Sequence, residues 1–185
     1  MQWNGIKLHI VVLALLVGLG VLWGGQWAFK RFNYERPLAV ALSENKYIAS
    51  YNIVSDGPEP EVEVSLKQVD NLQEAYLNIQ QSVDSAVSGK AVKITVKDNR
   101  DQVLENVYRD ASLAAYEALD RGNYLEMGDY IQKRASGEGA RARVSLDDQR
   151  LYIQIDHGDR YLYDIISRTG GAGNSSSDNG GGRPI

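Results

Sequence analysis

The sequence predicts an α+β protein, in which a single N-terminal transmembrane helix precedes one mixed, largely antiparallel sheet domain with three main helices. Three observations support this fold class. Residues 8–29 are apolar and carry no charged side chain. Later segments alternate apolar with polar residues, as half-buried strands do, or repeat apolar residues at helical spacing. Neighbouring strand segments are joined by short links, which favours antiparallel pairing.

The first element is the helix expected over residues 8–29. At about 1.5 Å per residue it would be roughly 33 Å long, close to the thickness of the hydrocarbon layer of a bilayer. Its apolar run exceeds the about 7–15 residues of a cleaved signal peptide, so it reads as an uncleaved signal anchor. Residues 1–7 form a short leader, and residues 30–36 form a juxtamembrane linker.

The orientation of this anchor rests on two arguments that disagree. Lys30, Arg31 and Arg36 follow the helix, whereas Lys7 precedes it, so the positive-inside rule places the following domain in the cytoplasm. A short leader followed by an anchor and a globular domain is more often an arrangement for an external domain. We therefore expect a single-pass protein of the cell membrane with an extracytoplasmic soluble domain. The absence of cysteine fits an extracytoplasmic bacterial domain, although many cytoplasmic domains also lack cysteine.

The soluble α+β domain is expected over residues 37–168. Its first half begins with a short helix, in which Pro37 takes the first position. Asp70 and Gln73 form a capping-box pattern at the start of a longer helix that ends near Gly89. Strands are expected on both sides of this helix, at residues 47–54, 61–67 and 91–97.

The second half is expected to contain a helical hairpin and three strands. Apolar residues at helical spacing run from Leu104 to a glycine corner at Gly122, and Asn123 starts a second helix that ends at Gly137. His157-Gly158 fits a two-residue turn between the last two strands. Residues 169–185 form a Gly/Ser-rich tail that we expect to be disordered. The three strands of this half are expected at residues 140–146, 151–156 and 161–166.

With the short first helix included, residues 37–97 run helix, strand, strand, helix, strand. This order resembles that of the small ring-building modules of membrane-embedded bacterial secretion assemblies. The resemblance covers only this part of the chain and implies an assembly role by analogy in element order.

Composition argues against several classes of function. The chain has 20 Lys and Arg against 24 Asp and Glu, and without a basic cluster in the domain we expect no nucleic-acid partner. His157 is the only histidine after the anchor and reads as a turn residue, so no site built on two histidines is expected. Ser43 and Lys46 match a Ser-x-x-Lys spacing without its companion motifs. We predict no enzyme, no cofactor and no resident metal ion.

Acidic residues in two neighbouring turns keep a cation site open as an alternative. These residues are Asp147, Asp148, Asp156 and Asp159. Carboxylates are ligands for calcium, but a twelve-residue calcium loop is missing and aspartate is common in turns.

Two groups of residues instead suggest interaction with a partner. Gly20, Gly24 and Ala28 recur every four residues and form a small-residue stripe on which a second helix could pack. Tyrosine outnumbers phenylalanine 11 to 2, and Tyr152, Tyr161 and Tyr163 gather on the last hairpin. Tyrosine suits a recognition surface, although the same rings could simply cover the sheet beneath the helices.

The sequence thus favours a membrane-anchored, non-enzymatic interaction or assembly module of a bacterial cell envelope. Its expected partners are the lipid bilayer and either another membrane or envelope protein or a second copy of the chain. The alternative is a membrane-tethered domain that senses a ligand or a cation.

Overall fold

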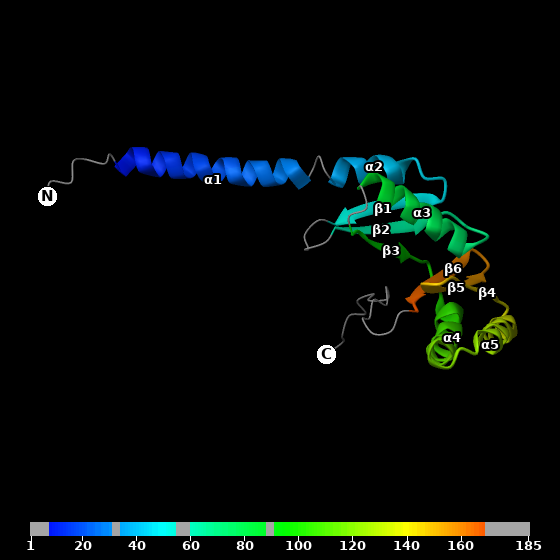
Figure 1. Cartoon of the computed structure of the whole chain (residues 1–185). Coiled ribbons are helices and arrows are strands. Elements are labelled where there is room, and N and C mark those ends of the chain that lie inside the picture. Colours follow the sequence, from blue (N-terminus) through cyan, green and yellow to red (C-terminus); the bar gives the residue numbers. More distant parts are fainter. Residues whose placement is uncertain (1–7, 31–33, 55–59, 88–90, 169–185) are drawn as a thin grey trace, which may run out of the picture.

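The computed structural model describes residues 8–30, 34–54, 60–87 and 91–168. This part of the chain is an α+β structure with five helices and two three-stranded sheets (Figure 1). The elements are, in order, α1 (Leu8–Lys30), α2 (Arg36–Ser43), β1 (Ile48–Val54), β2 (Glu61–Leu66), α3 (Leu72–Ala86), β3 (Lys93–Lys97), α4 (Gln102–Arg121), α5 (Tyr124–Gly137), β4 (Arg141–Leu146), β5 (Arg150–His157) and β6 (Arg160–Ser167).

The predicted transmembrane segment at residues 8–29 is wrong. A helix, α1, does form there, but no helix among the described residues is both long and apolar enough to cross a bilayer. The predictions of a signal anchor, a single-pass topology and an extracytoplasmic domain depended on this segment and are overturned with it.

The first sheet has the strand order β1-β2-β3 and lies beside α2 and α3 (Figure 1). β1 and β2 are antiparallel neighbours, whereas β2 and β3 run parallel and are connected through α3. A parallel pair needs such a crossover, because the chain must return to the starting end of the sheet. Val62, Val64 and Leu66 alternate with polar residues, and all three are buried against the helices as their spacing predicts.

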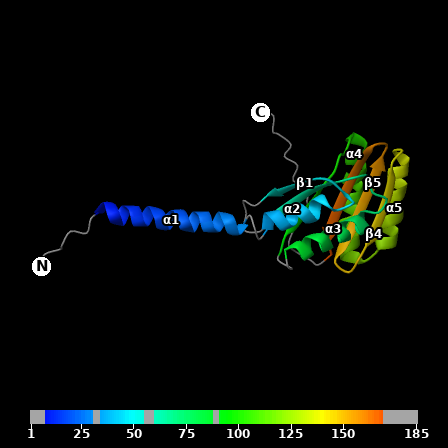
Figure 2. The same ribbon diagram turned by 90° about the horizontal axis from the view of Figure 1, so that it is seen from above.

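The second sheet is an antiparallel meander in the order β4-β5-β6. α4 and α5 form a hairpin that packs on one face of this sheet (Figure 2). Gly122 ends α4 in the left-handed conformation, with φ of +77°, which glycine adopts without the strain that a Cβ would add. The glycine corner predicted between the two helices is therefore present.

β5 is buried on both of its faces and connects the two halves of the fold. Leu151, Ile153 and Ile155 point into the core beneath α4 and α5, whereas Tyr152 belongs to the core that contains α3 and the first sheet. Gln154, on the same face as Tyr152, is only 3% exposed. Its amide accepts a hydrogen bond from the backbone N–H of Leu72 at 3.1 Å and donates one to the carbonyl of Val69 at 2.8 Å.

The sequence leaves open whether the six strands form one sheet or two, and the structure has two three-stranded sheets. The order of strands and helices after α2 agrees with the prediction. The two sheets meet at one isolated antiparallel bridge among the described residues, between Asn99 and Tyr161. β3 ends at Lys97, and the chain then turns through residues 98–101 into α4. Because β3 ends before this turn, β3 and β6 do not pair along their length.

Two local predictions need smaller corrections. The N-cap of α3 is Asn71, whose side chain accepts a hydrogen bond from the N–H of Glu74, and not Asp70. His157 is the last residue of β5 and pairs with Arg160, so the turn consists of Gly158 and Asp159. Gly158 has φ of +62°, a value that suits the first central residue of a hairpin turn. The predicted leader and tail, residues 1–7 and 169–185, lie outside the described residues.

Replacing Gln154 with alanine should lower the free energy of unfolding by about 2–4 kcal/mol, because it leaves a cavity and removes the partners of two buried backbone groups. Urea unfolding of the full chain measures the change. Gln149→Ala, at an exposed position in the β4–β5 turn, serves as the control and should change the midpoint little. Equal effects of the two substitutions would show that the Gln154 amide does not hold the two halves together.

Candidate functional site

The predicted small-residue stripe lies on α1. A Cβ added to Gly20 or Gly24 would meet no atom within 4 Å, so this face of the helix is open in the chain. The side chain of Ala28 lies outside the described residues. The role of the stripe in helix packing therefore stays a prediction.

The three tyrosines of the last hairpin mostly contribute to the core. Tyr152 is fully buried, and its hydroxyl donates a hydrogen bond of 2.8 Å to Asp147. Tyr163 is 4% exposed, and its ring stacks on that of Tyr161 with centroids 4.8 Å apart. Only Tyr161 keeps part of its ring at the surface. Tyr152 and Tyr163 therefore do not form a recognition surface, and they lie on the face of the sheet that is opposite the helical hairpin.

Ser43 and Lys46 are each engaged with a local partner. The Ser43 hydroxyl donates to the carbonyl of Val40 at 2.9 Å, one turn earlier in α2. The Lys46 ammonium lies 4.5 Å from the centroid of the Tyr47 ring. Neither contact activates a nucleophile.

The acidic turn residues do not gather into a metal site. In the described part of the chain, no group of three or more histidine, aspartate and glutamate side chains is arranged to hold a metal ion. Asp147 instead organises its own turn by accepting hydrogen bonds from the N–H groups of Gln149 and Arg150 at 2.8 and 2.7 Å. Burial opposes ionisation, yet these bonds and the Tyr152 hydroxyl hold the pKa of the Asp147 carboxyl below its usual value.

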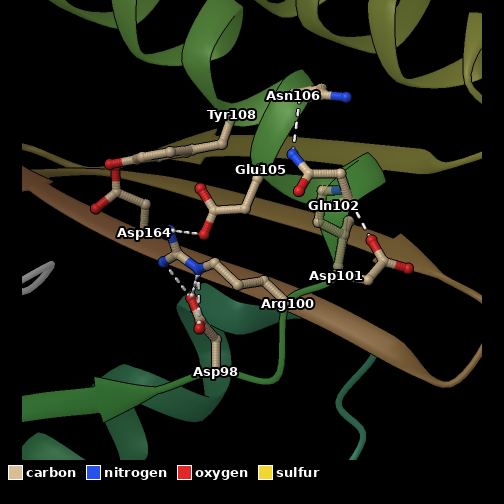
Figure 3. A network of polar contacts seen from close by, with 9 residues as sticks. Asp98, Arg100, Asp101, Gln102, Glu105, Asn106, Tyr108 and Asp164 are labelled. Atoms are coloured by element: carbon tan, nitrogen blue, oxygen red, sulfur yellow. Dashed lines mark hydrogen bonds and ion pairs between the residues drawn. The ribbon is translucent and has the colours of Figure 1, made fainter. Parts of the chain in front are cut away.

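A polar network occupies the junction between β3, α4 and β6 (Figure 3). The Arg100 guanidinium is paired with both carboxylate oxygens of Asp98, at 3.0 Å from its Nε. It also lies 3.6 Å from Glu105 and stacks over the ring of Tyr108, with its central carbon 5.1 Å from the ring centroid. The side chain of Arg100 is only 19% exposed, so its charge is held in place by these partners.

Asp164 on β6 is the buried acid of this network. It is 5% exposed, and its carboxylate accepts a hydrogen bond of 2.9 Å from the Tyr108 hydroxyl (Figure 3). Burial raises the pKa of the Asp164 carboxyl, and the Tyr108 hydroxyl and the charge of Arg100 oppose this rise without cancelling it. The arrangement joins α4 to the sheet and the β3–α4 turn.

A second polar pair fixes the other end of the same junction. Asp101 caps α4 by accepting the N–H of Leu104 at 2.9 Å, and its other oxygen lies 2.7 Å from Nδ1 of His157. The bond from Leu104, followed by that of His157, lowers the pKa of the Asp101 carboxyl. His157 was predicted to be only a turn residue, and its partner is 56 residues away in the sequence, which no local pattern could reveal.

A polar groove of about 400 Å³ lies at the start of β4. Its walls come from four separate segments, namely residues 68–70, α5, β4 and β5. Its polar and charged lining residues include Asp70, Gln132, Arg141, Arg143, Gln154 and Asp156. Burial raises the pKa of the Asp156 carboxyl, although Gln154, Arg141 and Arg143 counteract this rise. This groove was not predicted, because Arg141 and Arg143 read in the sequence only as the polar face of a strand.

Comparisons with known proteins identify no relative. No model of a protein family matches the chain, and neither a curated protein sequence nor a solved structure is significantly similar to it. The resemblance of residues 37–97 to ring-building modules therefore rests on element order alone.

The buried acid predicts a specific pH dependence. Because the native pKa of Asp164 is raised above the unfolded value of about 3.9, the native state holds this proton more tightly. The resulting stabilisation is complete below about pH 3.9 and is lost as the pH rises through the native pKa. Asn at this position keeps the acceptor for Tyr108 and cannot ionise.

We compare the free energy of unfolding of the parent protein with that of Asp164→Asn. The parent value minus the variant value should fall as the pH rises above about 3.9, until the pH exceeds the raised native pKa. The fall should be about 1.4 kcal/mol for each pH unit that separates the native and unfolded pKa values. Urea unfolding at several pH values measures this difference, and the other acids cancel in it. A difference that is constant with pH would contradict a raised pKa.

Proposed function

We propose that this chain is a non-enzymatic interaction or assembly module that associates with another protein through α1. The observation that carries the proposal is an apolar helix that the chain itself leaves uncovered. Nine large apolar side chains of α1 are between 49% and 81% exposed. They are Val12, Leu13, Leu15, Leu16, Val17, Leu19, Val21, Leu22 and Trp23.

An apolar helix of this kind gains free energy when it is covered. Burial of apolar surface is worth about 25 cal/mol for each Å² removed from water, and a helix that is apolar on all sides is normally buried. In Figures 1 and 2, α1 extends away from the two sheets, so the rest of the described chain does not cover it. An uncovered apolar surface of this extent is typical of an interaction site.

The glycines of α1 give this surface a face for close packing. Gly20 and Gly24 are four residues apart and therefore lie on the same side of the helix. The distance between two packed helices depends on the side chains at their contact, and glycine allows the shortest approach. The open space over both residues leaves this face available to a helix of a second copy or of a partner protein.

The contacts of the folded body support a role without catalysis. Two acids with shifted pKa values serve to join elements of the fold: Asp101 caps α4, and Asp164 accepts a hydrogen bond from Tyr108. The cation-sensing alternative gains no support, because the Asp147 carboxylate already accepts hydrogen bonds from two N–H groups of its own turn and from the Tyr152 hydroxyl on β5.

Deleting residues 1–32 should convert an oligomer or complex into a monomer, because it removes the apolar helix and leaves the two-sheet body. Size-exclusion chromatography with light scattering, carried out in mild detergent, measures the mass of both forms. Circular dichroism of the shortened chain shows whether the body remains folded. Equal association states for the folded shortened chain and the full chain would contradict the proposal.

Replacing Gly24 with leucine tests which face of α1 is used. Leucine would fill the centre of the glycine face and hold two helices apart, so the dissociation constant should rise by about tenfold or more, equivalent to about 1.4 kcal/mol. Val21→Leu adds bulk on another face and is the matched control. Sedimentation equilibrium in detergent measures both variants, and equal constants would show that association does not use the glycine face.

A further inference from the structure

The outer edge of β4 is free for pairing. β4 pairs only with β5 among the described strands. The N–H of Asp147 donates to the carbonyl of Arg150 at 2.9 Å and sets the hairpin register. Because backbone groups alternate in direction along an antiparallel strand, those of Ala142, Val144 and Leu146 then point away from β5. These three residues offer N–H and C=O groups to a further strand.

Two arginines lie beside this edge, and their charges act on Asp156 without a hydrogen bond or a short ion pair to it. Arg141 and Arg143 are exposed and line the groove at the start of β4. Neither guanidinium makes a hydrogen bond or a short ion pair with a described residue, whereas Arg100, Arg121 and Arg134 all do. The two arginines are two positions apart, so their side chains lie on the same face of the sheet.

We propose that the edge of β4 binds an extended peptide segment of a partner protein that carries acidic side chains at alternate positions. The segment adds to β4 as an antiparallel fourth strand of the second sheet. This proposal rests on the proposed interaction function and names the chemical class of a partner for a surface other than α1.

The geometry of strand pairing selects the acidic side chains. Side chains that lie directly opposite each other on neighbouring strands have Cβ atoms about 4.5–5.5 Å apart. Two carboxylates spaced by one residue would therefore face Arg141 and Arg143 at the same time. Arginine binds a carboxylate through two parallel hydrogen bonds, which adds geometric selectivity to the attraction of the charges.

Two acids line the groove together with the arginines. Asp156 on β5 is directly opposite Arg141, so its charge partly offsets that of Arg141. An added strand would lie on the other side of β4, about 4.8 Å from the arginines and about twice as far from Asp156. The Asp156 carboxylate also accepts a hydrogen bond from Gln154 at 3.1 Å. Asp70 belongs to the segment that precedes α3. The acidic side chains of the peptide therefore lie closer to Arg141 and Arg143 than to Asp156.

Charged side chains on an edge strand can also protect the edge, because they discourage pairing with strands of other chains. A protective role and a recognition role differ in which strands the arginines keep from pairing with β4. Arginines that only protect the edge would repel every strand, whereas arginines that recognise a partner discriminate between acidic and neutral strands.

The test measures binding of fluorescent peptides to the full chain in mild detergent by anisotropy. The probe alternates valine and glutamate (Val-Glu-Val-Glu-Val with blocked ends), and its partner peptide has glutamine in place of glutamate. A third peptide carries an N-methyl group on the central valine, whose N–H would face β4. The acidic peptide should bind at least tenfold more tightly than either of the others.

The variant Arg141→Gln/Arg143→Gln should weaken binding of the acidic peptide by at least tenfold. Arg109→Gln/Lys133→Gln removes the same charge from exposed positions of α4 and α5 and should bind as the parent does. No binding of the acidic peptide, or equal binding of the glutamine peptide, would overturn the proposal. Equal binding of the N-methylated peptide, or displacement by glutarate at the same concentration, would show a site for small anions without strand pairing.

This experiment is separate from the test of α1. Loss of peptide binding leaves the association state read by light scattering unchanged. Loss of association through α1 likewise leaves the groove and the edge of β4 intact, so the two proposals fail independently.

Discussion

The arrangement of the two sheets depends on the complete burial of β5. One face of this strand completes the core under α4 and α5, and the other completes the core that contains α3. The polar side chain of Gln154 lies between β5 and the core that contains α3, where it forms hydrogen bonds with the backbone of Val69 and Leu72. Buried polar groups are tolerated only with partners, so this amide defines how the N-terminal half sits on the second sheet.

Much of the element order could be predicted because it depends on local periodicity. The alternation of Val62, Val64 and Leu66, and the glycine corner at Gly122, are signals that a few neighbouring residues carry in full. The division into two sheets could not be predicted in this way, because it depends on where the chain bends after β3. The same holds for the N-cap of α3, where Asn71 and Asp70 are both suitable residues and packing decides between them.

The candidate sites were harder to predict than the fold. The groove beside β4 draws its walls from four segments, and the Arg100 network joins a turn, a helix and a distant strand (Figure 3). Tyrosine content suggested a recognition surface, yet the hydroxyl of Tyr152 reaches a partner inside the fold. A tyrosine on a strand is equally compatible with a core position and with a recognition surface. Only the arrangement of the two sheets shows which of these positions it occupies.

The position of Gln154 also has a consequence for the order of folding. Its bonds to Leu72 and Val69 span 82 and 85 residues, whereas α4, α5 and the meander β4-β5-β6 form one contiguous stretch. Contacts between residues close in sequence close smaller loops and lose less chain entropy. We therefore expect the C-terminal half to assemble first and to present β5 as a template on which the N-terminal half docks. Mutations at Gln154 would then change the unfolding rate and leave the folding rate nearly unaltered, with a φ-value close to zero.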